Sequence, residues 1–122
     1  MKTAISMTIL ILATSSVLTT PAIAMEVLIP RSVPGDKGKY YLLESRRKGD
    51  IVSAIHKRVG VEYVGYTQKE TNCRTMLMRE IGYSEESPEA IRPNPTKRFE
   101  LVPGSSKSDL AHFVCKLRAH QR

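Results

Sequence analysis

The protein has 122 residues, a length that excludes a large multidomain enzyme and allows one domain with a modest core. Nineteen Lys and Arg residues against 12 Asp and Glu residues give a formal net charge of +7 at pH 7. This balance favours acidic partners, such as a lipid surface, an anionic polysaccharide, nucleic acid or an acidic protein face. The charges are scattered, and their densest basic cluster is Arg46, Arg47 and Lys48, which we expect to contact an anionic partner.

The first 24 residues have the pattern of a secretory signal peptide. Lys2 supplies a positive start, residues 5–13 form an apolar core, and Ala22-Ile23-Ala24 has the small-x-small form of a cleavage site. Cleavage after Ala24 would leave one exported domain, residues 25–122, in the periplasm or outside the cell. The apolar core is short for a bilayer of about 30 Å, and no later stretch is long enough, so no transmembrane segment is expected.

Short strands are predicted through the first half of this domain. Apolar, aromatic or β-branched runs predict strands at 25–30, 40–45, 51–59 and 61–67, separated by loops at 31–39 and 46–50. Gly49 can supply a positive φ in the second loop, and Gly65 is a candidate β-bulge. The four-residue spacing of Ile51, Ile55 and Val59 would also suit a helix, but the β-branched content and flanking glycines favour a strand.

The second half is predicted to contain fewer strands and one helix. Residues 70–81 predict one long extended segment, with a helix as the alternative because Met76, Leu77 and Met78 form helices adequately. Three prolines make residues 85–95 a loop, and residues 98–102 predict a short strand that ends at Pro103-Gly104.

The clearest local signal is a helix after Gly104. Ser106 and Asp109 have the spacing of a capping box, with Ser106 as the N-cap. Four apolar residues then follow the spacing of one buried helical face: Leu110, Phe113, Val114 and Leu117. Asp109 near the start and Lys116 and Arg118 near the end also suit the helix dipole.

The two cysteines predict one disulfide. An even count in an exported chain favours a bridge between Cys73 and Cys115, worth roughly 4 kcal/mol on the loop-entropy model. Cys115 lies beside the apolar helix face, where it can reach a strand beneath the helix. The predicted fold class is therefore α+β, a small antiparallel β-sheet covered by one C-terminal α-helix tethered by a disulfide.

No group of residues forms a convincing catalytic or metal site. His56 and His112 could make a ribonuclease-like pair, and His112 with Cys115 could begin a metal site, but His112 lies on the polar helix face and the disulfide uses Cys115. His120 lies in a terminal tail. The nucleophile motif G-x-S-x-G, phosphate cradles and dinucleotide fingerprints are absent. We therefore expect no catalytic residue, no metal and no cofactor, and we read the tyrosines as strand packing rather than a nucleic-acid platform.

The C-terminal part resembles a known family. The order is Asn72-Cys73-Arg74 running on to Met78-Arg79, then an aromatic residue before Val102-Pro103-Gly104-Ser105, then Phe113-Val114-Cys115-Lys116. It is similar to the surface-adhesin protein E family of Gram-negative bacteria, over roughly residues 40–116. The resemblance implies a small antiparallel sheet, a C-terminal helix held by the Cys73–Cys115 bridge, and adhesion to host matrix proteins. Met25 stands where the family's adhesin carries a lipid-anchored cysteine, so no lipoprotein anchor is expected. A second difference from the family is Phe99, which stands where Trp is common.

These observations lead to one principal functional expectation and two alternatives. The principal expectation is an exported, non-enzymatic binding domain that contacts a host matrix protein, a polysaccharide or another anionic envelope component. The alternatives are a periplasmic accessory or inhibitor subunit of an envelope or secretion machine, and a small basic secreted hydrolase.

Overall fold

The computed structural model describes residue 11 and residues 26–117, so the predicted signal peptide, apart from Ile11, and His120 lie outside the described residues. A six-stranded antiparallel sheet has the order β1-β2-β3-β4-β5-β6. Its elements are β1 Val27–Leu28, β2 Lys39–Lys48, β3 Ile51–Val59, β4 Val64–Asn72, β5 Leu77–Ser84, the 3₁₀ turn η1 Pro88–Ala90, β6 Phe99–Glu100 and helix α1 Ser106–Lys116. No helix in the described part is long and apolar enough to cross a bilayer.

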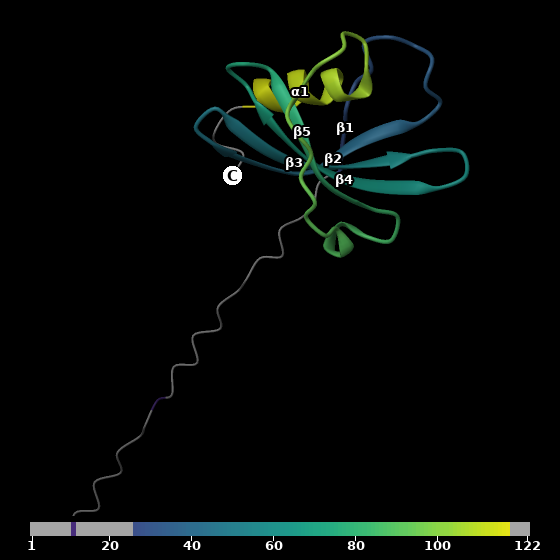
Figure 1. Ribbon diagram of the computed structural model, residues 1–122. Coiled ribbons are helices and arrows are strands. Elements are labelled where there is room, and N and C mark those ends of the chain that lie inside the picture. The colour runs from purple at the N-terminus through teal and green to yellow at the C-terminus, as the bar shows by residue number, and fades with distance from the viewer. Residues whose placement is uncertain (1–10, 12–25, 118–122) are drawn as a thin grey trace, which may run out of the picture.

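Helix α1 covers one face of the sheet, whereas the loop after β5 lies on the other side (Figure 1). The predicted α+β class, with an antiparallel sheet and one C-terminal helix, is confirmed for residues 26–117. Each strand lies beside its sequence neighbour in the sheet: short hairpin connections join β2 through β5 in turn, and longer loops join β1 to β2 and β5 to β6.

The predicted loop at residues 46–50 is wrong for its first three residues. Arg46, Arg47 and Lys48 extend β2, where they pair with the first residues of β3. Only Gly49 and Asp50 form the turn, and Gly49 has the expected positive φ of 60°. A glycine with positive φ at the first position of a two-residue hairpin is typical of a type II′ turn, whose twist matches the paired strands. Pairing along the hairpin therefore outweighs the polar character of these side chains.

The predicted single extended segment at residues 70–81 is also wrong. The chain reverses after Asn72, whose side-chain Oδ1 accepts hydrogen bonds from the backbone N–H groups of Arg74 (2.9 Å) and Thr75 (3.1 Å). Met76 donates its backbone N–H to the Asn72 carbonyl at 2.7 Å and has a left-handed φ of 58°. An asparagine that fixes its own turn explains the reversal. As a result, Cys73 lies in the β4–β5 turn rather than in a strand.

Helix α1 begins one residue earlier than the predicted cap at Ser106 implied. The N-cap is Ser105, whose Oγ accepts the backbone N–H of Ser108 at 3.1 Å. The Asp109 carboxylate does not complete a capping box. It instead accepts hydrogen bonds from Arg31 Nε (2.8 Å) and from the hydroxyl (2.6 Å) and backbone N–H (3.1 Å) of Ser32. Asp109 therefore ties the helix to the segment that follows β1.

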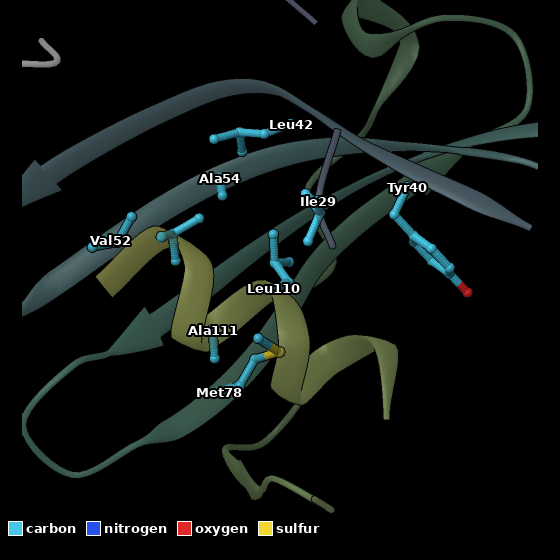
Figure 2. Packing of buried hydrophobic residues seen from close by; sticks show 9 residues of the cluster. Ile29, Tyr40, Leu42, Val52, Ala54, Met78, Leu110 and Ala111 are labelled. Atoms are coloured by element: carbon cyan, nitrogen blue, oxygen red, sulfur yellow. The ribbon is translucent and has the colours of Figure 1, made fainter. Parts of the chain in front are cut away.

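The hydrophobic core lies between α1 and the sheet (Figure 2). Its buried members come from β2, β3, β5, α1 and the residue after β1: Ile29, Tyr40, Leu42, Val52, Ala54, Met78, Leu110, Ala111 and Val114. The predicted helix face is confirmed for Leu110 and Val114, while Phe113 and Leu117 pack against the core and remain partly exposed. On β3, the buried set is the one containing Val52 and Ala54, so the helix covers that face.

The predicted disulfide is present between Cys73 and Cys115, with their Cα atoms 5.5 Å apart and a sequence separation of 42 residues. It joins the last turn of α1 to the β4–β5 turn, and Arg47 adds a hydrogen bond to the Cys115 carbonyl at 3.3 Å. The covalent link therefore fixes the C-terminal end of the helix over one end of the sheet.

Candidate functional site

The helix-covered face of the sheet changes from apolar to polar along its strands. On β3 the inward residues run Val52, Ala54, His56 and Arg58, and on β4 the residues opposite the last two are Thr67 and Gly65. The apolar end lies beneath the helix. The polar end forms the floor of a pocket of about 170 Å³ at the N-terminal end of α1.

Lys69 is the central charge of this pocket. It lies on β4 between Ala54 and Glu80, and only 5% of its surface is exposed. Within residues 26–117, no carboxylate pairs with its ammonium group and no hydrogen bond reaches it. Burial lowers the pKa of Lys69 to about 8, with Glu80 opposing this change and Lys107 adding to it. A buried cation without a partner is costly, and this pattern is characteristic of ligand-binding sites.

His56 lies next to Lys69 on the pocket floor and is 4% exposed. Neither of its ring nitrogens has a hydrogen-bond partner among the described residues. Burial, with a further contribution from the Lys69 charge, lowers the pKa of His56 to about 3, so the ring is neutral at pH 7. The ring packs at 6.1 Å from that of Tyr40, which forms one wall. The neutral His56 therefore adds no charge to the pocket floor, and Glu80 is the carboxylate that offsets part of the Lys69 charge.

Arg58, the second cation of the pocket, is already paired. Its Nη2 donates to Asp36 at 2.8 Å and its Nε donates to the Tyr40 hydroxyl at 3.2 Å, while that hydroxyl donates to Asp36. The bonds from Arg58 and then Tyr40 hold the pKa of the Asp36 carboxyl well below its usual range. The guanidinium also lies against Gly38 and Gly60, where an added Cβ would come within 2.6 and 2.5 Å. Arg58 is therefore a fixed and neutralised part of the wall.

Two half-exposed tyrosines flank the opening of the pocket. Tyr63 precedes β4 and is 52% exposed, and Tyr83 on β5 is 48% exposed. The predicted bulge at Gly65 is wrong, because Gly65 pairs in regular register with Arg58. A Cβ at Gly65 would lie 2.8 Å from the Tyr83 hydroxyl oxygen, so glycine is needed here for the close approach of that ring.

The start of α1 forms the remaining wall through Ser106. The first backbone N–H groups of a helix have no partner within the helix and give its N-terminus a partial positive charge. Together with Lys69, this arrangement gives the pocket a positive potential. The chemistry that fits it is an anionic, hydrogen-bond-accepting group.

The structure separates the three residues of the predicted anionic-contact cluster. Arg46 is exposed and forms an ion pair with Glu44 at 2.6 Å, whereas Arg47 bonds to the carbonyls of Gly49 (3.0 Å) and Cys115 (3.3 Å). Lys48 is exposed at the end of β2. Successive strand residues point to opposite faces, so Arg47 points away from Arg46 and Lys48, and none of the three lines the pocket. Their contact with an anionic partner stays a prediction.

The remaining sequence candidates lie elsewhere. His112 is exposed on α1 and bonds through Nδ1 to the Ser108 carbonyl at 2.8 Å, while His56 is buried beneath the start of the helix. The described residues contain no group of three or more His, Cys, Asp or Glu side chains placed to hold a metal ion.

Lys69 was not identified from the sequence, and His56 was considered only as part of a catalytic pair that was rejected. One signal was available: His56 and Arg58 alternate in phase with Val52 and Ala54, which places basic side chains on the face that also carries core residues. No family model, curated protein or solved structure matches this chain.

Proposed function

We propose that this protein is an exported, non-enzymatic binding domain that recognises an anionic partner, and that the pocket at the start of α1 receives the partner's anionic group. The observation that carries the proposal is Lys69, a nearly fully buried lysine with no ion-pair partner among residues 26–117. An incoming anion would supply the missing charge and accept hydrogen bonds from the ammonium group.

Two further features support a binding role. A general base works best with a pKa near the working pH, whereas the pKa of His56 is lowered to about 3, which makes it a weak base. The disulfide is typical of proteins that work in oxidising compartments, in keeping with the proposed export. The likeness to surface-adhesin protein E adds an adhesive role, through host matrix or other anionic surface components, to this proposal.

The test is binding of the purified, oxidised protein to resins carrying carboxylate, phosphate or sulfate groups. Lys69→Met should abolish the retention that depends on the pocket, because it removes the ammonium group and keeps most of the side-chain volume. Lys97→Met is the matched control, since Lys97 is exposed in the loop before β6 and its loss changes the net charge equally. Equal retention of wild type and both variants on every resin would rule the proposal out.

A further inference from the structure

The charge balance of the pocket limits the charge of its ligand. Asp36 neutralises Arg58 on the wall, so Lys69 is the pocket-lining cation that has no ion-pair partner among residues 26–117. Two other carboxylates lie near the pocket: Glu80, whose backbone is paired with that of Lys69 across β4 and β5, and Glu85, which accepts a hydrogen bond from the Tyr83 hydroxyl at 3.2 Å. Lys107 adds positive charge near Lys69, while Glu80 and Glu85 add negative charge, and this balance favours a monoanion over a dianion such as a phosphate monoester.

The size and lining of the pocket limit the shape of the ligand. Its volume of about 170 Å³ equals that of five or six water molecules, at roughly 30 Å³ each, which is less than a drug-sized ligand occupies. Tyr63 and Tyr83 present aromatic rings at the opening, while Thr67 and Ser106 add hydroxyls that can donate or accept. Such a lining suits one ring that carries both C–H faces and hydroxyl groups.

The position of the pocket in the sheet disfavours a peptide. Extended peptides commonly bind by adding a strand to an exposed sheet edge, where backbone groups are free. The floor of this pocket comes from β3 and β4, whose backbones are paired on both sides within the sheet. The sheet ends instead at β1 and β6, which are two residues long. A ligand here must be held by side chains, as a sugar would be.

We propose that the pocket binds one monoanionic sugar residue, a uronic-acid unit of an acidic polysaccharide, with its carboxylate at Lys69 and its ring against Tyr63 and Tyr83. This inference rests on the proposed function, because it names the chemical class of the anion that enters the same pocket. The sugar hydroxyls would meet Thr67, Ser106 and the tyrosine hydroxyls, and the chain would continue out of the opening into solvent.

The experiment is a calorimetric or NMR titration of the full-length oxidised protein at pH 7. The probes are sodium glucuronate, glucose, sodium acetate, inorganic phosphate and a tripeptide with a free C-terminal carboxylate. Glucuronate should bind at least about tenfold more tightly than each of the others, since ring stacking of about 1–3 kcal/mol adds to the charge contact. Lys69→Met should weaken glucuronate binding by about tenfold or more.

Three tyrosine variants separate ring recognition from charge recognition. Tyr63→Leu and Tyr83→Leu should each weaken glucuronate binding by about threefold to tenfold and leave acetate binding unchanged. Tyr41→Leu is the matched control, because Tyr41 is partly buried on β2 and does not line the pocket. It should change neither titration.

The failures of the two proposals can be told apart. If acetate, phosphate or the tripeptide binds as tightly as glucuronate, and Lys69→Met weakens that binding, the sugar assignment is overturned and the anion-binding function stands. If no probe binds in a way that depends on Lys69, both are overturned. Near-ultraviolet circular dichroism of each variant, compared with wild type, verifies that a loss of binding comes from a folded protein.

Discussion

At the scale of single residues, Lys69 combines a cost in stability with a capacity for binding. Its pKa of about 8 lies below the ordinary lysine value of 10.5, so the folded protein holds the Lys69 proton less tightly than the unfolded chain does. Between those two pH values the unfolded chain binds more protons, and the free energy of unfolding therefore rises with pH. Below pH 8 the penalty for the buried charge is present in full.

We therefore expect Lys69→Met to stabilise the protein at pH 7, by about 1–3 kcal/mol, while it removes anion binding. The gain should shrink as the pH rises from 8 to 10.5, because in this interval the folded wild-type protein loses the buried charge while the unfolded chain keeps its proton. Urea denaturation of wild type and Lys69→Met at several pH values from 7 to 10.5 measures this difference in the free energy of unfolding. A variant less stable than wild type at pH 7 would mean that the ammonium group is already satisfied.

His56 should control part of the acid sensitivity. Its pKa is lowered from 6.5 to about 3, so acid protonates this residue in the unfolded chain first, and stability falls as the pH drops through this interval. The free energy of unfolding of His56→Leu, measured relative to that of wild type, should therefore rise by about 2–3 kcal/mol as the pH is lowered from 7 to 4. Because Asp36 and Asp109 are present in both proteins, their titration largely cancels in this difference. A constant difference across the range would contradict the buried, neutral state of the ring.

At the scale of elements, the start of α1 gives a sharp test of the observed cap. Ser105→Ala should lower the free energy of unfolding by about 1 kcal/mol, because the Ser108 N–H loses its acceptor. Ser106→Ala should have a much smaller effect, since Ser106 already lies inside the helix. Chemical denaturation of the two variants distinguishes them, and the reverse order of effects would place the cap at Ser106, as the capping-box pattern predicted.

Strand β3 was predictable from composition and flanking glycines, and its predicted bounds of 51–59 are those observed. The buried face of that strand was harder to predict, because Ile51 and Ile55 on the other face are larger and more apolar than Val52 and Ala54. The position of α1 decides which face is buried, and that position depends on tertiary contacts. The pocket lies on the face that the helix covers, so its position could not be predicted from the sequence pattern alone.

The β4–β5 reversal shows a different limit. Its left-handed residue is Met76, a residue type that rarely adopts a positive φ, so no glycine marked the turn. Asn72 was the available signal, since its side chain can bond to the backbone two residues further on. The surrounding residues otherwise fit an extended segment, and the reversal is fixed by pairing between β4 and β5.

At the scale of the whole molecule, the disulfide holds the helix over the sheet. The bridge spans 42 positions, so its loss should lower the free energy of unfolding by about 4 kcal/mol, within a range of about 2–5. The double variant Cys73→Ser with Cys115→Ser, compared with the oxidised wild type by urea denaturation, measures this directly. A loss below about 1 kcal/mol would show that packing of α1 alone fixes the helix.

The fold, the bridge and the pocket form one arrangement. The Cys73–Cys115 bond fixes the C-terminal end of α1, the bonds of Asp109 to Arg31 and Ser32 hold its first turn, and the start of the helix then lies over Lys69. The even cysteine count of the sequence led to the prediction of the first of these constraints. The uncompensated lysine beneath the helix is the feature that turns this scaffold into a proposed receptor for an anion.

The most direct measurement is the pKa of Lys69, followed by the NMR chemical shift of its Cε across pH, without ligand and with saturating sodium glucuronate. We predict a pKa of about 8 in the free protein, because burial disfavours the charged amine, and a rise toward the ordinary value of 10.5 when the carboxylate binds. A free-state pKa near 10.5 that does not move with any anion would contradict the existence of a buried, uncompensated charge at this site.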